Sequence, residues 1–381
     1  MEIYDIITVE SAVNMQYIYQ LQDWPDFRWD SEVLSSELAR VRHEQGILLG
    51  RMNSLGFELR SEATLLSLTE EVIKTSAIEG ENLHHDEVRS SIANKLGLDV
   101  GGVLPSSRDV DGVVEMMLDA TQNFEAPLTQ ERLFGWHSLL FPFGRSGMHK
   151  ITVGNWRTDV NGPMQVVSGV YGKERVHFVA PDAEKLQQEM DMFIDWFNSN
   201  NENDPVIKSA IAHLWFVTIH PFADGNGRIA RAIADMALAR SDGTKDRYYS
   251  MSSGIESERN QYYHQLEFTQ RSSLDITSWL TWFLQCFGRV IDEAENSVKK
   301  VLFKAKVWEH ANKHSTNDRQ RKVINRLLEN FEGKLTTSKF AKLAKCSNDT
   351  ALRDINELVT CEILKKNEGG GRSTSYSLIE H

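Results

Sequence analysis

Apolar residues recur at helical spacing over most of the chain, which predicts a mainly helical protein. The first such stretch runs from Ser31 to about Leu59, with Ser31 as the expected N-cap. A second helix is expected over 61–81, where Gly80 provides the helix end that glycine favours. The glycine- and serine-rich stretch 97–108 predicts a loop.

The central region predicts one buried helix. Asp204 is a suitable N-cap, and Pro205 fits the first helical position. Residues 206–219 are apolar almost all round the helix, which is typical of a buried element. Pro221 ends this helix because the residue before a proline avoids the helical region, so we expect His220 to open a loop.

One hairpin interrupts the helices. Residues 164–180 contain two β-branched runs on either side of Tyr171, Gly172 and Lys173, which predicts two antiparallel strands and a turn. Helical spacing then resumes, and residues 277–312 predict one long helix or two.

The C-terminal segment has a different pattern. Three short helical stretches are followed by two short strand-like runs around a glycine-rich turn. This order resembles a winged helix-turn-helix, with 348–358 as the recognition helix. Residues 315–381 carry 12 Lys and Arg residues against 9 Asp and Glu, a mild basic bias that is compatible with DNA binding. Arg353, Lys365, Lys366 and Arg372 would then contact DNA, whereas the alternative is a dimerisation or protein-docking unit.

Composition narrows the class of protein. The 381 residues include 41% hydrophobic and 25% charged residues, as in ordinary globular proteins, and no apolar run is long enough for a membrane span. The acidic start lacks the pattern of a signal peptide. Three cysteines without a CxxC pair argue against disulfides or a zinc site and favour a cytoplasmic location. The net charge of −12 disfavours non-specific nucleic-acid binding by the whole chain.

The stretch "HPFADGNGRIAR" (220–231) combines residues that suit a polyphosphate beside a base. A helix is expected to begin near Gly227, and the first turn of a helix binds phosphate through its free N–H groups. Gly225 and Gly227 allow close approach of an anion, and Asn226 offers a further donor. Arg228 and Arg231 are neighbours on the helix surface, so both can reach one phosphate chain.

Two other side chains in this stretch suit the chemistry of phosphoryl or nucleotidyl transfer. Asp224 offers an oxygen ligand for Mg²⁺, and His220 can accept a proton near neutral pH. A lone histidine at a helix end is usually structural, and a lone GxG is usually a turn. The joint pattern is far more specific than either part.

The whole stretch resembles the signature of the Fic family, H-P-F-x-[D/E]-G-N-G-R-x-x-R, at every fixed position. The resemblance covers roughly 61–300 and implies a Fic-type helical core that transfers AMP from ATP to a Ser, Thr or Tyr hydroxyl of a protein. It implies that His220 is the general base, that Asp224 holds magnesium and that Arg231 binds the γ-phosphate. The anion-binding nest would be formed by Gly225, Asn226, Gly227 and Arg228.

Two further segments fit the same family. The hairpin occupies the place of the family's flap, so Val166, Val167, Ser168 and Gly169 would bind the target's backbone by strand addition, unless the hairpin is plain structure. The stretch "RNQYYHQLEFTQ" resembles the adenine-pocket segment, and it would contribute Tyr262 and Tyr263, for which core packing is the alternative. Relatives often have Asn where Gln270 stands, so the choice of nucleotide stays open.

The end of the helix over 61–81 resembles the family's inhibitory motif, [S/T]-x-x-x-E-[G/N], as Thr75, Glu79 and Gly80. By that resemblance, Glu79 pairs with Arg231 and keeps it from the γ-phosphate of ATP. A plain surface glutamate is the alternative.

Together these observations predict three regions: an N-terminal helical region (1–60), a catalytic region (61–312) and a winged helix (313–381). The expected function is a self-inhibited protein adenylyltransferase that uses ATP and Mg²⁺ on a target protein. The alternatives are a DNA-binding regulator that senses nucleotide, and transfer of another nucleotidyl or phosphoryl group. No membrane partner is expected. The aromatic stretch "DWPDFRWD" either packs on the core or forms a homodimer.

Overall fold

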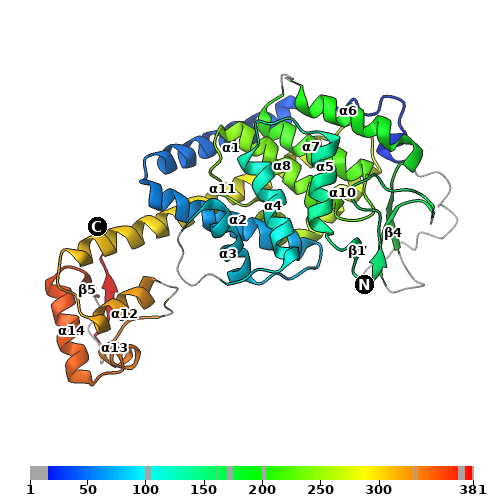
Figure 1. Ribbon diagram of the computed structural model, residues 1–381. Coiled ribbons are helices and arrows are strands. Elements are labelled where there is room, and N and C mark those ends of the chain that lie inside the picture. The colour runs from blue at the N-terminus through cyan, green and yellow to red at the C-terminus, as the bar shows by residue number, and fades with distance from the viewer. Residues whose placement is uncertain are drawn as a thin grey trace, which may run out of the picture. The chain divides into compact units, whose positions relative to one another are not determined.

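The computed structural model describes residues 16–98, 104–160, 162–169, 175–199, 203–328, 331, 333–367 and 374–379. Contacts divide the chain into two compact units, Met1–Ala294 and Glu295–His381 (Figure 1). The end of the long helix α11 (Thr277–Asn312), which we expected in the catalytic region, belongs to the second unit.

The first unit is mainly helical, as predicted, with two small antiparallel sheets. Before α11, its helices are α1 (Ser31–Asn53), α2 (Phe57–Ile78), α3 (His85–Leu96), α4 (Arg108–Gln122), α5 (Gln130–Leu140), α6 (Leu186–Asn198), α7 (Pro205–Ile219), α8 (Asn226–Asp242), α9 (Met251–Ser257) and α10 (Arg259–Gln270). Its strands are β1 (Arg145–Ser146), β2 (His149–Lys150), β3 (Gln165–Ser168) and β4 (Arg175–Val179).

The first two helices begin and end differently from the prediction. The N-cap of α1 is Asp30 rather than Ser31, because the Asp30 carboxylate accepts hydrogen bonds from two backbone N–H groups of the first turn. Helix α1 ends at Asn53 and not near Leu59. The next helix starts at Phe57, with the extended backbone of Gly56 as its N-cap. The predicted boundary at residue 60 therefore falls inside α2.

The N-terminal aromatic stretch packs on the core. The rings of Trp24 and Phe27 lie edge-on to Trp215 of α7, with ring centroids 6.1 and 5.7 Å away. Trp24 also donates a hydrogen bond from Nε1 to Glu189 of α6 at 2.9 Å. Tyr17 packs edge-on against Phe178 of β4. Packing is thus the role that the structure gives this segment.

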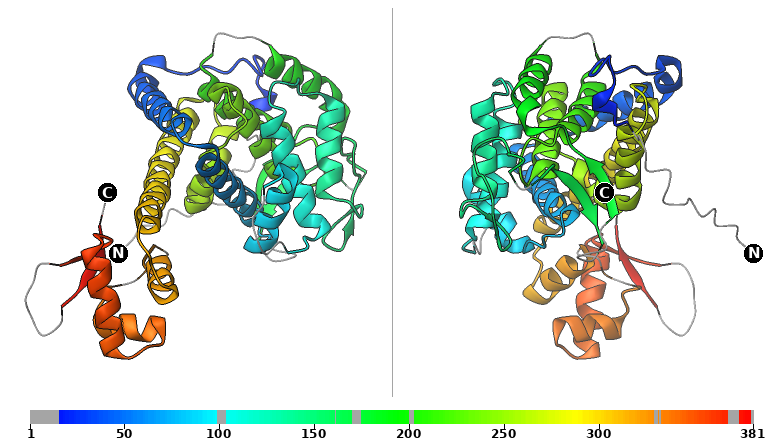
Figure 2. Two further views of the ribbon diagram at one scale, coloured as in Figure 1. Left: turned by 60° about the vertical axis from the view of Figure 1, so that its left-hand side comes forward. Right: turned by 90° about the vertical axis from the view of Figure 1, so that its right-hand side faces the viewer.

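Helices α7 and α8 form the centre of the first unit (Figure 1). Nearly every side chain of α7 is buried, as its apolar sequence predicts. Asp204 caps α7 through its carboxylate, and Ser209 ties α7 to α8 by donating to the Ala234 carbonyl at 2.9 Å. Figure 2 shows α1 crossing the N-terminal part of α11, where Gly288 leaves room for the Arg40 guanidinium.

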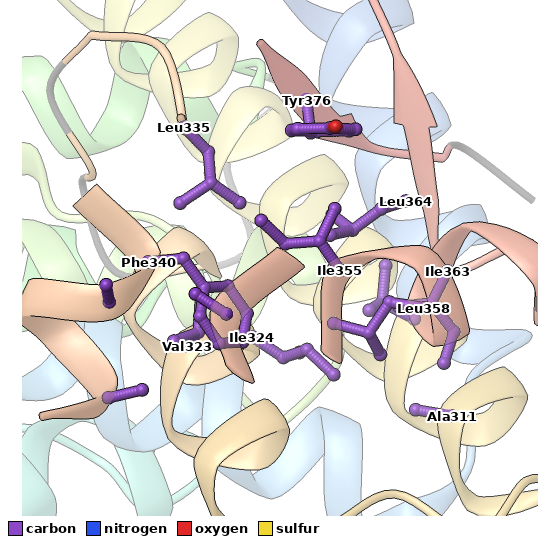
Figure 3. Packing of buried hydrophobic residues seen from close by; sticks show 14 residues of the cluster. Ala311, Val323, Ile324, Leu335, Phe340, Ile355, Leu358, Ile363, Leu364 and Tyr376 are labelled. Carbon is purple, nitrogen blue, oxygen red and sulfur yellow. The ribbon is translucent and has the colours of Figure 1, made fainter. Parts of the chain in front are cut away.

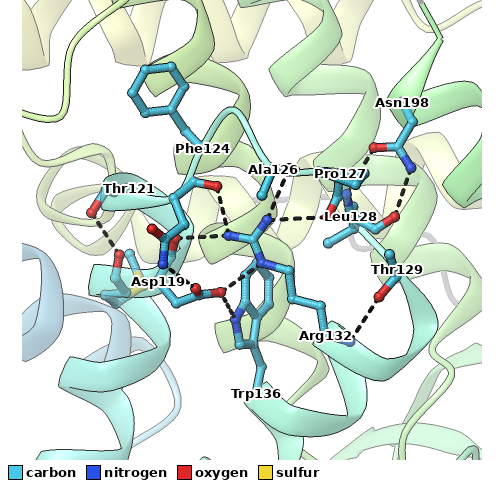
Figure 4. A network of polar contacts seen from close by, with 12 residues as sticks. Asp119, Thr121, Phe124, Ala126, Pro127, Leu128, Thr129, Arg132, Trp136 and Asn198 are labelled. Carbon is cyan, nitrogen blue, oxygen red and sulfur yellow. Dashed lines mark hydrogen bonds and ion pairs between the residues drawn. The ribbon is translucent and has the colours of Figure 1, made fainter.

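A polar network fixes the connection between α4 and α5 (Figure 4). Arg132 donates from Nε to the Asp119 carboxylate at 2.7 Å, and its terminal nitrogens donate to backbone carbonyls of the connecting loop. Trp136 donates to the same carboxylate at 2.7 Å. These bonds fix the position of α5, whose last turn lies under the loop between α7 and α8.

The second unit contains the end of α11, the helices α12 (Asp318–Leu328), α13 (Thr337–Ala344) and α14 (Asn348–Thr360), and the antiparallel strands β5 (Leu364–Lys366) and β6 (Tyr376–Leu378). Figure 3 shows apolar side chains from these elements meeting in one core, including Phe340, Ile355 and Leu364. Thr336 and Ser347 cap α13 and α14 through their side-chain hydroxyls. The interpretation as a winged helix stays a prediction. Among the described residues of both units, no helix is both long enough and apolar enough to span a bilayer.

Candidate functional site

The predicted site lies where α7 ends and α8 begins. His220 follows the last residue of α7 with φ of +52°, in the left-handed region that few residues other than glycine adopt. Its backbone N–H still closes the helix by donating to the Phe216 carbonyl at 3.0 Å. The chain therefore turns sharply at His220 into the loop that precedes α8.

The imidazole of His220 is held in one tautomer. Nδ1 lies 3.2 Å from the Val217 carbonyl, which can only accept, so Nδ1 carries the proton and Nε2 keeps its lone pair. Burial lowers the pKa of His220 to about 4, although the Val217 contact raises it. The residue is half-buried rather than enclosed. His220 is thus a neutral base at pH 7.

Arg157, which the sequence did not single out, holds the backbone next to His220. Its Nε donates to the His220 carbonyl at 2.8 Å, and its backbone N–H donates to the Pro221 carbonyl at 2.9 Å. The guanidinium also donates to the Pro181 carbonyl and to Asp159. The Arg157 side chain is 3% exposed, so these bonds form a buried brace for the sharp turn.

The loop reaches α8 through Gly225 and Asn226. Gly225 has φ of +79°, and a Cβ there would lie 2.9 Å from the Phe141 ring and 3.1 Å from Leu140, so only glycine fits. We had expected Asn226 to offer its side-chain amide to an anion, but that amide is bonded to the loop instead. Its side chain accepts from the Phe222 N–H at 2.9 Å and donates to the Phe222 carbonyl at 2.8 Å. Asn226 therefore fixes the loop, because both ends of its amide are already bonded.

The two arginines of the signature are buried at the start of α8. Arg228 and Arg231 are each 3% exposed. Among the described residues, Nε of Arg228 and Nη1 of Arg231 find no acceptor. Leaving a buried donor without a partner costs free energy. These N–H groups are therefore suited to bind an acceptor that the described residues do not supply.

The C-terminal end of α2 lies against these arginines. Arg231 donates to the Thr75 hydroxyl and to the Glu79 carboxylate, both at 2.7 Å, so the pair predicted from the sequence is present. A Cβ on Gly227 would lie only 2.1 Å from Glu79 Oε1. The carboxylate therefore occupies the space beside the first turn of α8, where an anion is favoured.

A second glutamate, which the sequence analysis overlooked, meets the other arginine. Glu81 Oε2 lies 2.7 Å from Nη1 of Arg228. Burial raises the pKa of Glu81, and the nearby carboxylates of Asp224 and Glu79 add to that effect, while Arg228 opposes it. Glu81 lies just beyond the end of the helix, where helical periodicity cannot indicate a direction.

Asp224 lies in the loop between α7 and α8 and is partly exposed. One carboxylate oxygen accepts from the Gly225 N–H at 2.6 Å, and the other is hydrogen-bonded to the Ser146 hydroxyl of β1. Within the described ranges, no three His, Cys, Asp or Glu side chains gather in a way that suits a metal ion. A metal at Asp224 would therefore need ligands from a bound molecule.

The predicted hairpin is confirmed in its strands. Gln165 to Ser168 pair antiparallel with Arg175 to Val179, and Val167 is 48% exposed. Val166 is half-buried, while Ser168 and Gly169 are exposed. Residues 171–173, expected as the turn, lie outside the described residues. Among the described residues β3 pairs with β4 alone, which leaves its other edge unpaired, as strand addition requires.

The two tyrosines of the expected adenine pocket differ. Tyr262 is 2% exposed, and its hydroxyl lies 2.9 Å from Nε2 of His213 in the core, so the structure favours the core-packing alternative there. Tyr263 is 40% exposed and donates to the Ile78 carbonyl at 3.2 Å, at the end of α2. Gln270 is buried and donates to the Thr218 hydroxyl at 3.2 Å.

The expected DNA contacts lie in the second unit. Arg353, Lys365 and Lys366 are exposed, and Arg372 lies outside the described residues. The exposed face of α14 also carries Asp349 and Glu357. This face is therefore of mixed charge rather than basic.

Comparisons with known proteins agree with the geometry. The Fic/DOC family matches residues 127–238, and a domain of unknown function (DUF4172) matches 17–98. The chain is 34% identical to "Protein adenylyltransferase fic-1" of Caenorhabditis briggsae over 45% of its length and 31% of that relative. It is 33% identical to "Protein adenylyltransferase Fic" of Drosophila grimshawi over 30% of its length and 22% of the relative. The matches thus span less than a third of these relatives.

Solved structures support the same fold. A Fic family protein from Desulfovibrio desulfuricans G20 aligns over 93% of this chain and 98% of its own, with a TM-score of 0.54 and 20% identity. A Fic domain containing signaling protein from Bacteroides thetaiotaomicron aligns over 68% of this chain and 97% of its own, with a TM-score of 0.50 and 21% identity. These structures share the fold, and the family model assigns a Fic/DOC domain to residues 127–238 of this chain.

Proposed function

We propose that this protein transfers AMP from ATP to a hydroxyl group of a target protein and releases pyrophosphate. The proposal is supported by the relatives, which are protein adenylyltransferases by name, and by the complete signature at 220–231. The observation that carries it is the pair of buried guanidinium groups, Arg228 and Arg231, each with an N–H that has no acceptor among the described residues. A triphosphate supplies the oxygens that such donors need.

His220 would act as the general base. A target hydroxyl attacks the α-phosphorus of ATP, and the bond from that phosphorus to the pyrophosphate oxygen breaks. The hydroxyl proton passes to Nε2 of His220, whose lone pair is free because Nδ1–H is bonded to the Val217 carbonyl. Arg157 keeps the imidazole in place by bracing the backbone on which it stands.

The start of α8 would hold the phosphates. The first N–H groups of a helix have no partner within the helix and carry a partial positive charge. Arg228 and Arg231 add two full charges to that end of α8. Mg²⁺ fits the site, because it commonly binds one carboxylate together with substrate phosphates, and Asp224 offers that carboxylate. The ion would neutralise phosphate charge when bound.

The target would dock on the hairpin. Strand addition uses the backbone of an exposed edge strand, and β3 offers one beside the exposed Val167, Ser168 and Gly169. This mode needs little from the target's sequence beyond an extended segment that carries a hydroxyl. We place the acceptor residue in such a segment of the target protein.

Glu79 would inhibit the enzyme. With Arg231 bonded to Glu79 at 2.7 Å, that arginine is not available to the γ-phosphate. ATP then lacks one of the contacts that align its α-phosphate with the attacking hydroxyl. Removal of Glu79 should therefore raise the transfer rate.

Labelling with ATP carrying a tagged adenine tests the proposed function. Glu79→Gly protein should incorporate label into itself or a target, and Glu79→Gly/His220→Ala protein should not. UTP and GTP, added as competitors, decide whether another nucleotide is preferred, a question that Gln270 leaves open. Incorporation of a terminal-phosphate label instead would show phosphoryl transfer and contradict the proposal.

DNA binding by 313–381 remains a separate prediction. The mixed charge on the exposed face of α14 offers it little support, since DNA affinity depends on phosphate contacts by basic residues. A shift assay on the full chain at two salt concentrations tests it, with Lys365→Glu/Lys366→Glu as the variant. Binding that falls with salt and with the variant would support a DNA-binding regulator.

A further inference from the structure

We propose that Glu81 is a second inhibitory carboxylate, which occupies Arg228 while Glu79 occupies Arg231. This inference rests on the proposed function, since it concerns how the same site is kept from ATP. The two contacts are alike in kind: each joins a carboxylate at the end of α2 to a buried arginine of α8 at 2.7 Å. Both phosphate-binding arginines of the signature are thus engaged from one segment.

A fixed turn presents the two carboxylates. The N–H of Gly80 donates to the Ala77 carbonyl at 3.0 Å, and the N–H of Glu81 donates to the Ser76 carbonyl at 3.0 Å. This pair of bonds is the Schellman motif, and Gly80 supplies the left-handed residue that it needs, with φ of +85°. Glu79 and Glu81 are therefore placed on either side of one ordered glycine, each facing a different arginine.

Helix stability alone does not account for the two acids. The C-terminal end of a helix carries partial negative charge, so acidic residues there are unfavourable. Glu81 also lies near Glu79 and Asp224, whose negative charges disfavour a third carboxylate. The contact with Arg228 opposes these costs in part, and it would be lost when a phosphate chain takes that arginine.

The two contacts differ in how easily they open. The Glu81 side chain is 49% exposed, whereas the Glu79 side chain is 31% exposed. Salt screens the more exposed pair more strongly, and water competes for it. Release is therefore expected in steps, with Arg228 freed before Arg231.

The experiment measures ATP binding without catalysis. In a His220→Ala background, the Kd for ATP is determined for four proteins: the background itself, Glu81→Gln, Glu79→Gly, and the combination. Glu62→Gln is the matched control, because it removes an exposed glutamate from the same helix. Glu62 lies 17 positions from Glu79, or about 25 Å along the helix axis.

The inference predicts that Glu81→Gln tightens ATP binding about two- to fivefold, the effect of an exposed ion pair. It predicts a gain at least as large in the Glu79→Gly background, because removing Glu79 relieves the repulsion on the Glu81 carboxylate and leaves its contact with Arg228 in place. Glu62→Gln should leave the Kd unchanged. The gain from Glu81→Gln should shrink as salt is raised.

An unchanged or weaker ATP affinity in Glu81→Gln protein, in either background, would overturn the inference. Circular dichroism confirms that the variant is folded, so that a loss of structure is not taken for a binding effect. The readout is independent of the proposed function. If Glu79→Gly protein with intact His220 transferred no AMP while Glu81→Gln still tightened ATP binding, the function would be wrong and the second contact right.

Discussion

Replacing Glu79 with glycine removes one carboxylate from Arg231 and leaves the other contacts of that arginine in place. Thr75 still accepts from Nε of Arg231 at 2.7 Å through its hydroxyl, and from Nη2 at 2.8 Å through its carbonyl. The guanidinium therefore stays at the start of α8, with Nη1 and the N–H of Nη2 that Glu79 had held free for phosphate oxygens. A space also opens beside Gly227, where the carboxylate had been.

The size of the effect follows from the contact that is lost. A hydrogen bond to a charged group contributes about 1.5–3 kcal/mol, and the partial exposure of Glu79 places it in the lower half of that range. Each 1.4 kcal/mol corresponds to about a tenfold change, so the AMP transfer rate should rise about ten- to thirtyfold. Glu79→Gln removes the charge and keeps the shape of the side chain. Its AMP transfer rate should therefore lie between the rates of the original protein and of Glu79→Gly.

The assay follows pyrophosphate release and label incorporation at saturating ATP and Mg²⁺. Glu79→Gly/His220→Ala protein controls for release that does not depend on the base. Equal rates for the original protein and Glu79→Gly would refute the assignment of Glu79 as inhibitor. An equal rise in Glu62→Gln protein would refute it as well, because a general charge effect would then be sufficient.

Three further outcomes are expected. Because desolvation lowers the pKa of His220 to about 4, the neutral base persists as pH falls, and the Glu79→Gly rate should hold from pH 8 to about pH 5. A decline centred near pH 6.5 would contradict the lowered pKa of His220. Arg157→Lys should lower kcat with little change in the KM for ATP, because Arg157 holds the backbone of His220 in place. A raised KM with unchanged kcat would contradict that role. Tyr262→Phe should lower the free energy of unfolding, measured by urea denaturation, by about 1–2 kcal/mol, because His213 loses its hydrogen-bond partner; the affinity for ATP should not change. Weaker ATP binding at unchanged stability would instead place Tyr262 in the nucleotide pocket.

The sequence predicted the central elements because their signals are local. The apolar circumference of α7, the Asp204 cap and Pro221 fix that helix and its end without reference to the rest of the chain. Gly225, just before α8, and Gly227, in its first turn, likewise predict a close approach to that turn. Even the contact between Glu79 and Arg231, distant in sequence, was predicted, but through the resemblance to a family and not from spacing.

The rest depends on contacts that no local pattern encodes. Arg157 braces His220 across 63 positions of the chain, and nothing around Arg157 indicates that its partner is a backbone carbonyl. The Asn226 amide was assigned to an anion, yet the loop geometry turns it onto Phe222. Tyr262 and Tyr263 are adjacent, and only the packing around α10 decides that the first is buried and the second exposed.

Intact-mass measurement of the Glu79→Gly protein, incubated with ATP and Mg²⁺, tests the central claim most directly. Transfer of AMP to a hydroxyl predicts a gain of about 329 Da per modified site, absent when His220 is also replaced by alanine. The account would be contradicted if neither the Glu79→Gly protein nor its candidate targets gained this mass. It would also be contradicted if the mass gain persisted in the Glu79→Gly/His220→Ala protein, because transfer would then not depend on the neutral imidazole.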